Sequence, residues 1–404
     1  MRALQSPAAD IVIAGHICLD VIPAIHGHKH GSGLGELLVP GKLVEIGPAV
    51  LSTGGAVSNT GLALHRLGFP VKLMGKIGDD PFGGLIMGIL KGHGEALARD
   101  MIVARGESSS YSIVISPPSV DRVFLHCTGA NDTFASEDVT AESLQSAKLF
   151  HFGYPPLMRR MFADGGTELE RLLYKVKAQG LTVSLDLARP DPDSPAGQVD
   201  WPAILARVLP YVDVFLPSFE EIVYMLRPEV YRELSEQHGT TDMIAYADGP
   251  LLSSLSEQLL NMGAAMIGLK LGEYGFYLRT ASSRERLAAM GACTPDEERL
   301  TDWQDRELLA PCFQVEVVGT TGAGDCTIAG FLGGLWKRST IEEVLLGAVG
   351  VGACNVERAD AVSGIRSWAE VQARMAAGWN RSEAALLLPG WTYESKPGIW
   401  ELRR

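Results

Sequence analysis

The chain of 404 residues is 46% hydrophobic and 21% charged, a composition typical of a globular enzyme. Its net charge of −13, without a visible cluster of Lys or Arg, argues against nucleic-acid binding and against attachment to an anionic membrane. The six cysteines stand singly, without the paired spacing of a zinc site or a redox dithiol, and no apolar stretch reaches the roughly 18 residues of a membrane span. We therefore expect a soluble, cytoplasmic protein with reduced thiols that acts on small molecules.

The first predicted strand covers residues 10–22, DIVIAGHICLDVI, a nearly continuous apolar run that is typical of a parallel strand buried on both faces. Asp20 is its one acidic interruption. Ligands of open α/β sheets bind outside the carboxyl ends of the strands, so this carboxylate is placed for ligand contact, although a surface turn would contain the same residue. A further strand is predicted over residues 71–77.

A glycine pair, Gly54 and Gly55, precedes a helix of small and apolar residues that ends at Gly68 with a glycine C-cap. Asn59 lies one turn into this helix. Its amide offers both a donor and an acceptor to a polyol, but a solvated helix face would suit the residue equally well.

Two segments, residues 21–52 and 104–128, interrupt the predicted strand–helix alternation. The first has β-favouring pieces at 37–39 and 42–46, and the second is a predicted hairpin of 111–115 and 122–127 around residues 117–119. Together they predict a small separate sheet. A sheet inserted beside the ligand end of an α/β core is suited to be a lid that excludes water.

The remaining chain returns to alternating strands and helices, which predicts a parallel sheet with right-handed crossovers. The predicted strands are 148–152, 182–186, 213–216, 264–270 and 275–279, and the predicted helices are 168–179, 204–209, much of 227–262, 341–357 and 368–377. Asp186 ends one strand, and Glu221 follows another at a position that a helix cap would also explain. The charged stretch 281–310 shows no helix or strand pattern. The tail 385–404 is expected to be an extension that packs on the surface or against another chain.

A glycine-rich turn at residues 320–325 connects a predicted strand, 313–318, to a predicted helix, 326–337. Gly322 and Gly324 lack the Cβ atoms that would block close approach of a ligand. The unpaired N–H groups and the positive dipole at the start of the helix make an anion site. Asp325 would then be either a helix cap or a base that accepts a hydroxyl proton during phosphoryl transfer.

With both glycine motifs in view, the chain resembles the PfkB family of carbohydrate kinases, which have the ribokinase-like fold. The resemblance covers most of the chain in the right order. The first family signature is matched by Gly54, Gly55, Asn59, Leu67 and Gly68, and the second by Thr320, Gly322, Ala323, Gly324 and Asp325. It implies one kinase domain over residues 1–404, with a three-layer α/β/α core around a mostly parallel sheet, and a small β-sheet lid.

The resemblance also implies roles for single residues. Asp325 would be the general base, with the N–H groups of Gly322, Ala323 and Gly324 in the anion hole. The sugar hydroxyls would be bound by Asp20, Gly54, Gly55 and Asn59. The residues implied on the nucleotide side are Lys270, Gly272, Gly275, Thr320, Thr321 and Asn355, and Glu221 would support Mg²⁺.

Two positions depart from the family pattern. Gly319 replaces the Asp that helps to form a monovalent-cation site, so potassium activation is not predicted. Ser218 replaces the Asn of an Asn-x-x-Glu pattern that keeps Glu221, and Mg²⁺ is still expected because it must neutralise the transferred phosphate.

The leading hypothesis is an ATP-dependent kinase that phosphorylates a hydroxyl of a small sugar or nucleoside, with a possible homodimer through the lid. The alternative is a sugar- or nucleotide-binding regulator that kept the fold but lost the chemistry. A dinucleotide enzyme lacks support, because no Gly-x-Gly-x-x-Gly follows the first strand.

Overall fold

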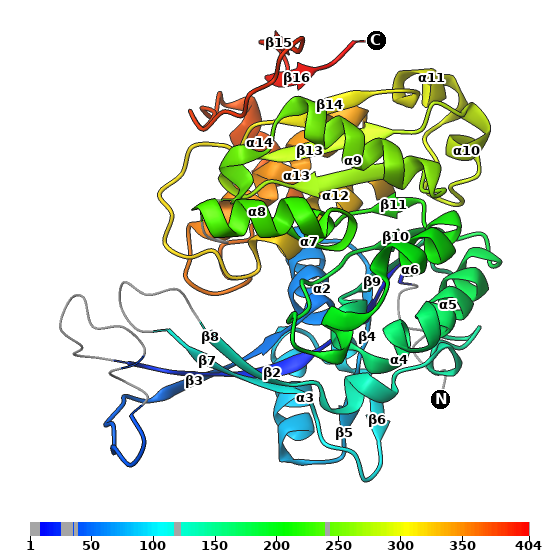
Figure 1. Cartoon of the computed structure of the whole chain (residues 1–404). Coiled ribbons are helices and arrows are strands. Elements are labelled where there is room, and N and C mark those ends of the chain that lie inside the picture. Colours follow the sequence, from blue (N-terminus) through cyan, green and yellow to red (C-terminus); the bar gives the residue numbers. More distant parts are fainter. Residues whose placement is uncertain (1–8, 26–34, 36–38, 117–122, 239–242, 404) are drawn as a thin grey trace.

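A computed structural model describes residues 9–25, 35, 39–116, 123–238 and 243–403 (Figure 1). Its central element is a 10-stranded sheet with the order β15-β16-β14-β13-β12-β11-β10-β9-β1-β4. The six strands from β4 to β12 are parallel, and the four beyond β12 are antiparallel. Their bounds are β1 Ile11–Gly15, β4 Val71–Met74, β9 Leu149–Gly153, β10 Thr182–Leu185, β11 Val214–Phe215, β12 Met266–Lys270, β13 Phe276–Thr280, β14 Glu307–Ala310, β15 Thr392–Glu394 and β16 Ile399–Glu401.

Helices cover both faces of this sheet, which confirms the predicted three-layer α/β/α core. One face carries α2 (Ala56–Leu67), α12 (Ala323–Trp336) and α13 (Ile341–Val356), and α14 (Trp368–Ala376) packs on α13. The other face carries α5 (Thr167–Lys177), α6 (Trp201–Val208), α7 (Phe219–Leu226) and α9 (Gly249–Asn261). The remaining α-helices are α3 (Pro81–His93), α4 (Arg159–Phe162), α8 (Pro228–His238), α10 (Arg284–Ala288) and α11 (Leu300–Trp303).

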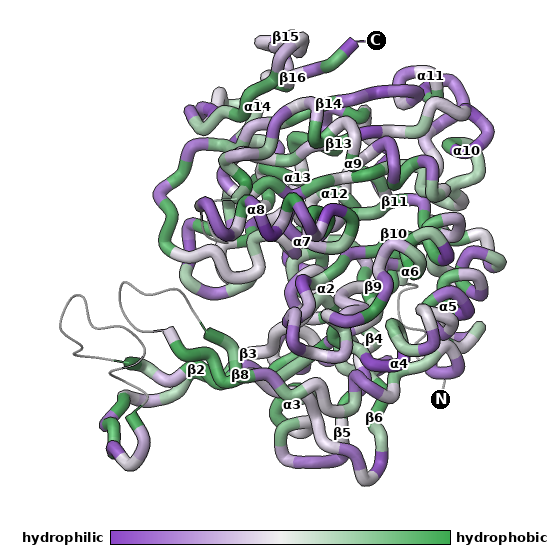
Figure 2. The backbone as a smooth tube through the Cα atoms, in the orientation of Figure 1, coloured by the Kyte–Doolittle hydropathy of each residue, from purple (hydrophilic) through white to green (hydrophobic). Residues whose placement is uncertain are grey.

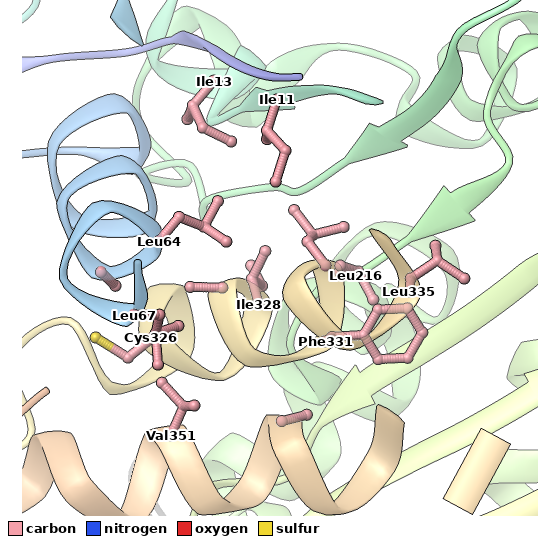
Figure 3. Close-up of a cluster of buried hydrophobic side chains, with 14 of the residues drawn as sticks. Ile11, Ile13, Leu64, Leu67, Leu216, Cys326, Ile328, Phe331, Leu335 and Val351 are labelled. Atoms are coloured by element: carbon pink, nitrogen blue, oxygen red, sulfur yellow. The ribbon is translucent and has the colours of Figure 1, made fainter. Parts of the chain in front are cut away.

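The alternation along β1 shows how the sheet separates two cores. Ile11 and Ile13 belong to the hydrophobic cluster around α12, whereas Val12 and Ala14 belong to the cluster on the opposite face. Figure 3 shows Ile11 and Ile13 above Ile328 and Phe331 of α12. Because α12 lies between the sheet, α2 and α13, its start is held firmly in place.

A separate four-stranded sheet, with the order β3-β2-β7-β8, extends away from the core (Figure 1). It consists of β2 (Cys18–Pro23), β3 (Ala49–Gly54), β7 (Tyr111–Ile115) and β8 (Val123–Cys127). The predicted hairpin is confirmed at β7 and β8, although residues 117–122 lie outside the described residues. Residues 42–46 form no strand, and most of the piece at 37–39 is not described.

Two predicted strands are each divided between two sheets. Residues 10–22 contain β1 in the large sheet and β2 in the four-stranded sheet, because the chain turns at Gly15 with a φ of 122°. Residues 71–77 similarly contain β4 and the start of β5 (Lys76–Gly78), which pairs with β6 (Ile102–Ala104) in a third, two-stranded sheet.

The C-terminal third differs from the predictions in three places. The strand predicted at 313–318 is wrong: apart from one isolated bridge between Phe313 and Arg381, this segment is irregular, and Val317 and Val318 are 61% and 58% exposed. The unassigned stretch 281–310 contains α10, α11 and β14. The tail extends the large sheet with β15 and β16, and the ring of Trp391 packs 6.1 Å from that of Tyr277. Among the described helices, none is long and apolar enough to cross a membrane.

Candidate active site

Polar side chains gather where the parallel strands of the large sheet end. His16 follows β1, Tyr154 follows β9, Asp186 follows β10, and Lys270 is the last residue of β12. The start of α12, with Asp325 in its first turn, faces the same edge. This is the edge at which open α/β sheets bind ligands.

Three donors from distant parts of the chain hold the carboxylate of Asp325. Asn59 Nδ2 donates to Oδ2 at 2.9 Å, and the Tyr154 hydroxyl lies 2.9 Å from both carboxylate oxygens. Thr60 Oγ1 donates to Oδ1 at 3.3 Å. Burial nevertheless raises the pKa of Asp325, because only 4% of the residue is exposed. A positioned carboxylate with a raised pKa is suited to accept a proton.

The turn before α12 adopts the conformation that its glycines permit. Gly322 is the N-cap, with a φ of 72°, and a Cβ atom there would lie 2.9 Å from the Cβ of Ala361. Gly324 leaves room for Lys270, whose Cδ would lie 3.4 Å from an added Cβ atom. The N–H of Ala323 donates to the Thr320 carbonyl at 3.3 Å, so the anion hole predicted here would depend mainly on the other N–H groups of the turn.

A cavity of about 820 Å³ extends from Asp325 between α12, the start of α7 and the β12–β13 turn. It brings together most of the residues that the resemblance placed in the catalytic turn and on the nucleotide side. The predicted residues that line it are Glu221, Lys270, Gly272, Gly275, Thr320, Gly322, Ala323, Gly324 and Asp325. Thr321 and Asn355 are not among the lining residues. Asn355 is buried, and its Nδ2 donates to the Ala361 carbonyl at 2.6 Å.

Four carboxylates lie around Lys270, and three of them, Glu220, Glu221 and Asp325, line the cavity with it. Lys270 Nζ lies 2.6 Å from Asp186 Oδ1, and burial together with the charges of Glu221 and Asp325 raises the pKa of Asp186. Burial alone would lower the pKa of Lys270, but the neighbouring Asp186 and Glu221 raise it. Burial also raises the pKa of Glu220. The excess negative charge favours a bound cation.

The side chains present fit Mg²⁺. Asp186 Oδ2 is buried and has no hydrogen-bond partner within the described structure, so a cationic ligand would satisfy it. Glu221 caps α7 by accepting from the Ser218 N–H at 2.6 Å, yet it also lines the cavity. The cap interpretation of Glu221 is therefore confirmed, and it does not exclude a role at the metal.

On the other side of Asp325, the two glycines of the first motif make room for polar side chains. A Cβ atom on Gly54 would lie 2.3 Å from Asp20 Oδ2, and one on Gly55 would lie 2.5 Å from His16 Nδ1. Asp20 lies on β2 of the four-stranded sheet and not at the end of a core strand, and burial raises its pKa. Asn59 is buried and does not lie on a solvated helix face.

Sequence reasoning missed Tyr154, Thr60 and His16. Tyr154 has a left-handed backbone, with φ 65° and ψ 42°, which is costly for a tyrosine and is frequent at functional sites. The sequence signal was the polar residue directly after the buried strand LFHFG. Thr60 and His16 had no signal of their own, because their partners are distant in the chain.

The resemblance implies an acidic residue at the position of Gly319, but the space beside this glycine is filled. A Cβ atom there would lie 2.8 Å from the Cα of Ala359 and 3.1 Å from the Arg358 carbonyl oxygen. An aspartate would require this loop to shift, so the departure at Gly319 is matched by the surrounding structure.

Comparison with known proteins gave consistent matches. Residues 8–368 match the pattern of the pfkB family carbohydrate kinases. Over 381 residues, 92% of this chain and 98% of the relative, the chain is 24% identical to an Arabidopsis thaliana protein named "Probable fructokinase-4". Its fold is similar to that of fructokinase with bound ATP from Xylella fastidiosa (TM-score 0.64, 18% identity, 91% and 99% of the two chains). It is also similar to that of Arabidopsis thaliana ribokinase complexed with ribose and ATP (TM-score 0.65, 17% identity, 91% and 98%).

Proposed function

Because the chain belongs to the PfkB family of carbohydrate kinases, we propose that it transfers the γ-phosphoryl group of ATP to a hydroxyl of a small, unphosphorylated sugar or nucleoside. The observation that carries this proposal is the position of Asp325. It lies at the start of α12, between the 820 Å³ cavity and the four-stranded sheet, and three donors fix its carboxylate.

The six cysteines are all free thiols, which is in keeping with the cytoplasm.

Asp325 acts as the general base in this proposal. The acceptor hydroxyl approaches its carboxylate, which accepts the proton as the oxygen attacks phosphorus. In the structure without ligand, the Tyr154 hydroxyl contacts both carboxylate oxygens of Asp325. The acceptor hydroxyl therefore replaces Tyr154 at one of these two oxygens when it binds. The N–H groups at the start of α12 stabilise the charge that grows on the phosphoryl oxygens.

The cavity between α12, α7 and the β12–β13 turn is the proposed nucleotide side. Lys270, held by Asp186, binds phosphate oxygens, and Gly272 and Gly275 let the β12–β13 turn pass close to the nucleotide. Asp186 and Glu221 would hold Mg²⁺, which supplies charge neutralisation to the transferring phosphate when it is bound. The bound ATP in the similar structures supports ATP as the donor.

A sugar is the favoured acceptor, since the relatives are named fructokinase and ribokinase. The proposed acceptor side comprises Asp20, Gly54, Gly55 and Asn59, and the four-stranded sheet serves as its lid. The alternative is a regulator that binds sugar or nucleotide without turnover. The intact network around Asp325 favours the enzyme, because a binding protein would not need a fixed buried base.

The test is ADP release from ATP and Mg²⁺ across a panel of fructose, ribose, other sugars and nucleosides. The kinase proposal predicts acceptor-dependent ADP release by the wild-type chain. A binding-only regulator would show thermal stabilisation by a sugar without any ADP release. That result with the acceptor that stabilises the chain best would refute the proposal.

We further propose that a second copy of the chain pairs through the four-stranded sheet. Leu51, Ile113 and Leu125 are exposed, and all three share one face, because Val21 pairs with Leu51 and Ile113, and Ile113 pairs with Leu125. Figure 2 shows hydrophobic residues along β2 and β8. Light scattering should give the mass of a dimer for the wild type and of a monomer for Leu125→Glu. A monomeric wild type would exclude this pairing.

A further inference from the structure

Three side chains that could bind a metal meet where the core joins the four-stranded sheet. His16 lies in the connection between β1 and β2, Cys18 begins β2, and His126 lies on β8. Their donor atoms all lie within 4.8 Å of one another, and within the described part of the chain they form the one such group of three. The two Nε2 atoms of His16 and His126 are 3.2 Å apart.

The strand register brings these residues together. Asp20 pairs with Ser112 across β2 and β7, and Ser112 pairs with His126 across β7 and β8, so the three share one face of the sheet. Cys18 lies two residues before Asp20 and therefore points to the same face. No sequence spacing revealed this group, because His126 is 110 residues from His16.

Neighbouring side chains orient the group as they do around bound metals. Ser112 Oγ lies 3.0 Å from His126 Nδ1, which leaves the Nε2 of this ring directed at His16. Such a partner on the second ring nitrogen is the usual support of a metal-binding histidine. Cys18 Sγ lies 3.3 Å from Asp20 Oδ1, a carboxylate that can accept the thiol proton.

His16 uses its Nε2 atom in this group, because its Nδ1 faces the backbone at Gly55, where an added Cβ atom would lie 2.5 Å away. His16 is buried, and its Nδ1 has no hydrogen-bond partner within the described structure. Two Nε2 atoms 3.2 Å apart either share one proton in a hydrogen bond or, once that proton is lost or moved to Nδ1, both direct lone pairs at a common metal ion.

We propose that His16, Cys18 and His126 bind one Zn²⁺ ion, with a fourth position left open to solvent or to a ligand. Zinc bonds of about 2.0–2.1 Å to nitrogen and about 2.3 Å to sulfur place tetrahedral ligands about 3.3–3.6 Å apart. The 3.2 Å between the two nitrogens is close to that separation. On binding, the thiol proton of Cys18 passes to Asp20 or to solvent, and the thiolate forms the bond to zinc.

The proposed ion would lie beside the acceptor side of the kinase site. The rings of His16 and Tyr154 are 6.0 Å apart, and the hydroxyl of Tyr154 contacts Asp325. Competition between zinc and the acceptor follows if the proposed kinase function holds. The metal site itself does not depend on that function, and its binding is measured without turnover.

Cobalt(II) titration of the metal-free full-length chain tests the site. One equivalent should produce thiolate-to-cobalt charge-transfer absorption together with the visible bands of a tetrahedral site, and Zn²⁺ should abolish both. In Cys18→Ser the charge-transfer band should be lost. Cys127→Ser is the matched control, because Cys127 follows His126 on the same strand, and it should bind like the wild type.

His126→Gln provides a second variant for the case that Cys18→Ser fails to fold, because His126 is exposed and Cys18 is buried. It should fold like the wild type and bind Co²⁺ at least tenfold more weakly. The site is excluded if the wild type takes up no cobalt with thiolate character. It is equally excluded if the charge-transfer band persists unchanged in folded Cys18→Ser or if His126→Gln binds like the wild type.

Discussion

Replacement of Asp325 by asparagine should separate chemistry from binding and from folding. A general base contributes on the order of 10² to 10⁴ in rate, or about 3–5 kcal/mol of transition-state stabilisation. The asparagine has nearly the same shape, and its Oδ1 can accept from Asn59. Its amide can donate to the hydroxyl of Tyr154, which then accepts. We therefore expect kcat to fall by that factor while the Kd for ATP changes little.

The stability of this variant provides an internal control. Burial raises the pKa of Asp325, so the charged carboxylate destabilises the native state. The stability that protonated Asp325 contributes is fully present below the unfolded-state pKa and is lost as the pH rises through the folded-state pKa. Asp325→Asn removes this cost, and at pH 7 the free energy of unfolding should be unchanged or higher.

ADP release and denaturant unfolding should be compared for the wild type, Asp325→Asn and the surface control Asp302→Asn. Asp302 is exposed on α11 and does not line the cavity. The control should keep both the wild-type rate and the wild-type stability. A folded Asp325→Asn variant with near-normal turnover on the best acceptor would refute the assignment of the base.

Three further predictions concern the neighbours of this residue. Because burial raises the pKa of Asp325, the acid limb of the pH–rate profile should lie above the ordinary pKa range of an aspartate. Tyr154→Phe removes a donor to the carboxylate and should move this acid limb to still higher pH. Lys270→Met removes the ion-pair partner of the buried Asp186 and should lower the free energy of unfolding in urea titrations, by at most about 3–5 kcal/mol because Asp186 can take up a proton, whereas an unchanged midpoint would contradict the ion pair. Wild-type turnover should be equal in potassium chloride and in choline chloride, and activation by potassium would contradict the absence of a monovalent-cation site at Gly319. Gly319→Asp should lower Tm, because the new side chain would meet the backbone of Ala359.

The strands and helices were largely predictable because local patterns determine them. The helix predicted over 341–357 is α13, which begins at a Thr340 capping box, and the helix predicted over 368–377 is α14, which begins at a Ser367 capping box. The prediction failed where a partner strand decides the outcome. Residues 313–318 have the β-favouring composition of a strand, but no neighbouring strand pairs with Val317 or Val318.

Most residues of the candidate site could be predicted from the sequence, but the contacts between them could not. Asn59 and Asp325 were each identified from their own motif, as a sugar ligand and a base. The structure shows that they also bind each other across 266 residues of sequence. No local pattern encodes such a pairing, because it depends on how α2 and α12 pack against the same sheet.

Two of the buried polar atoms that lack a partner within the described structure belong to Asn59 and Asp186, on the two sides of Asp325. Nδ2 of Asn59 must face the carboxylate of Asp325, which leaves its Oδ1 buried and without a partner within the described structure. A hydroxyl of the acceptor would satisfy this oxygen by donating to it. The orphaned Oδ2 of Asp186 lies on the nucleotide side. Unsatisfied buried groups are costly and rare, so these two atoms beside one base indicate that an acceptor on one side and a cation on the other complete the site.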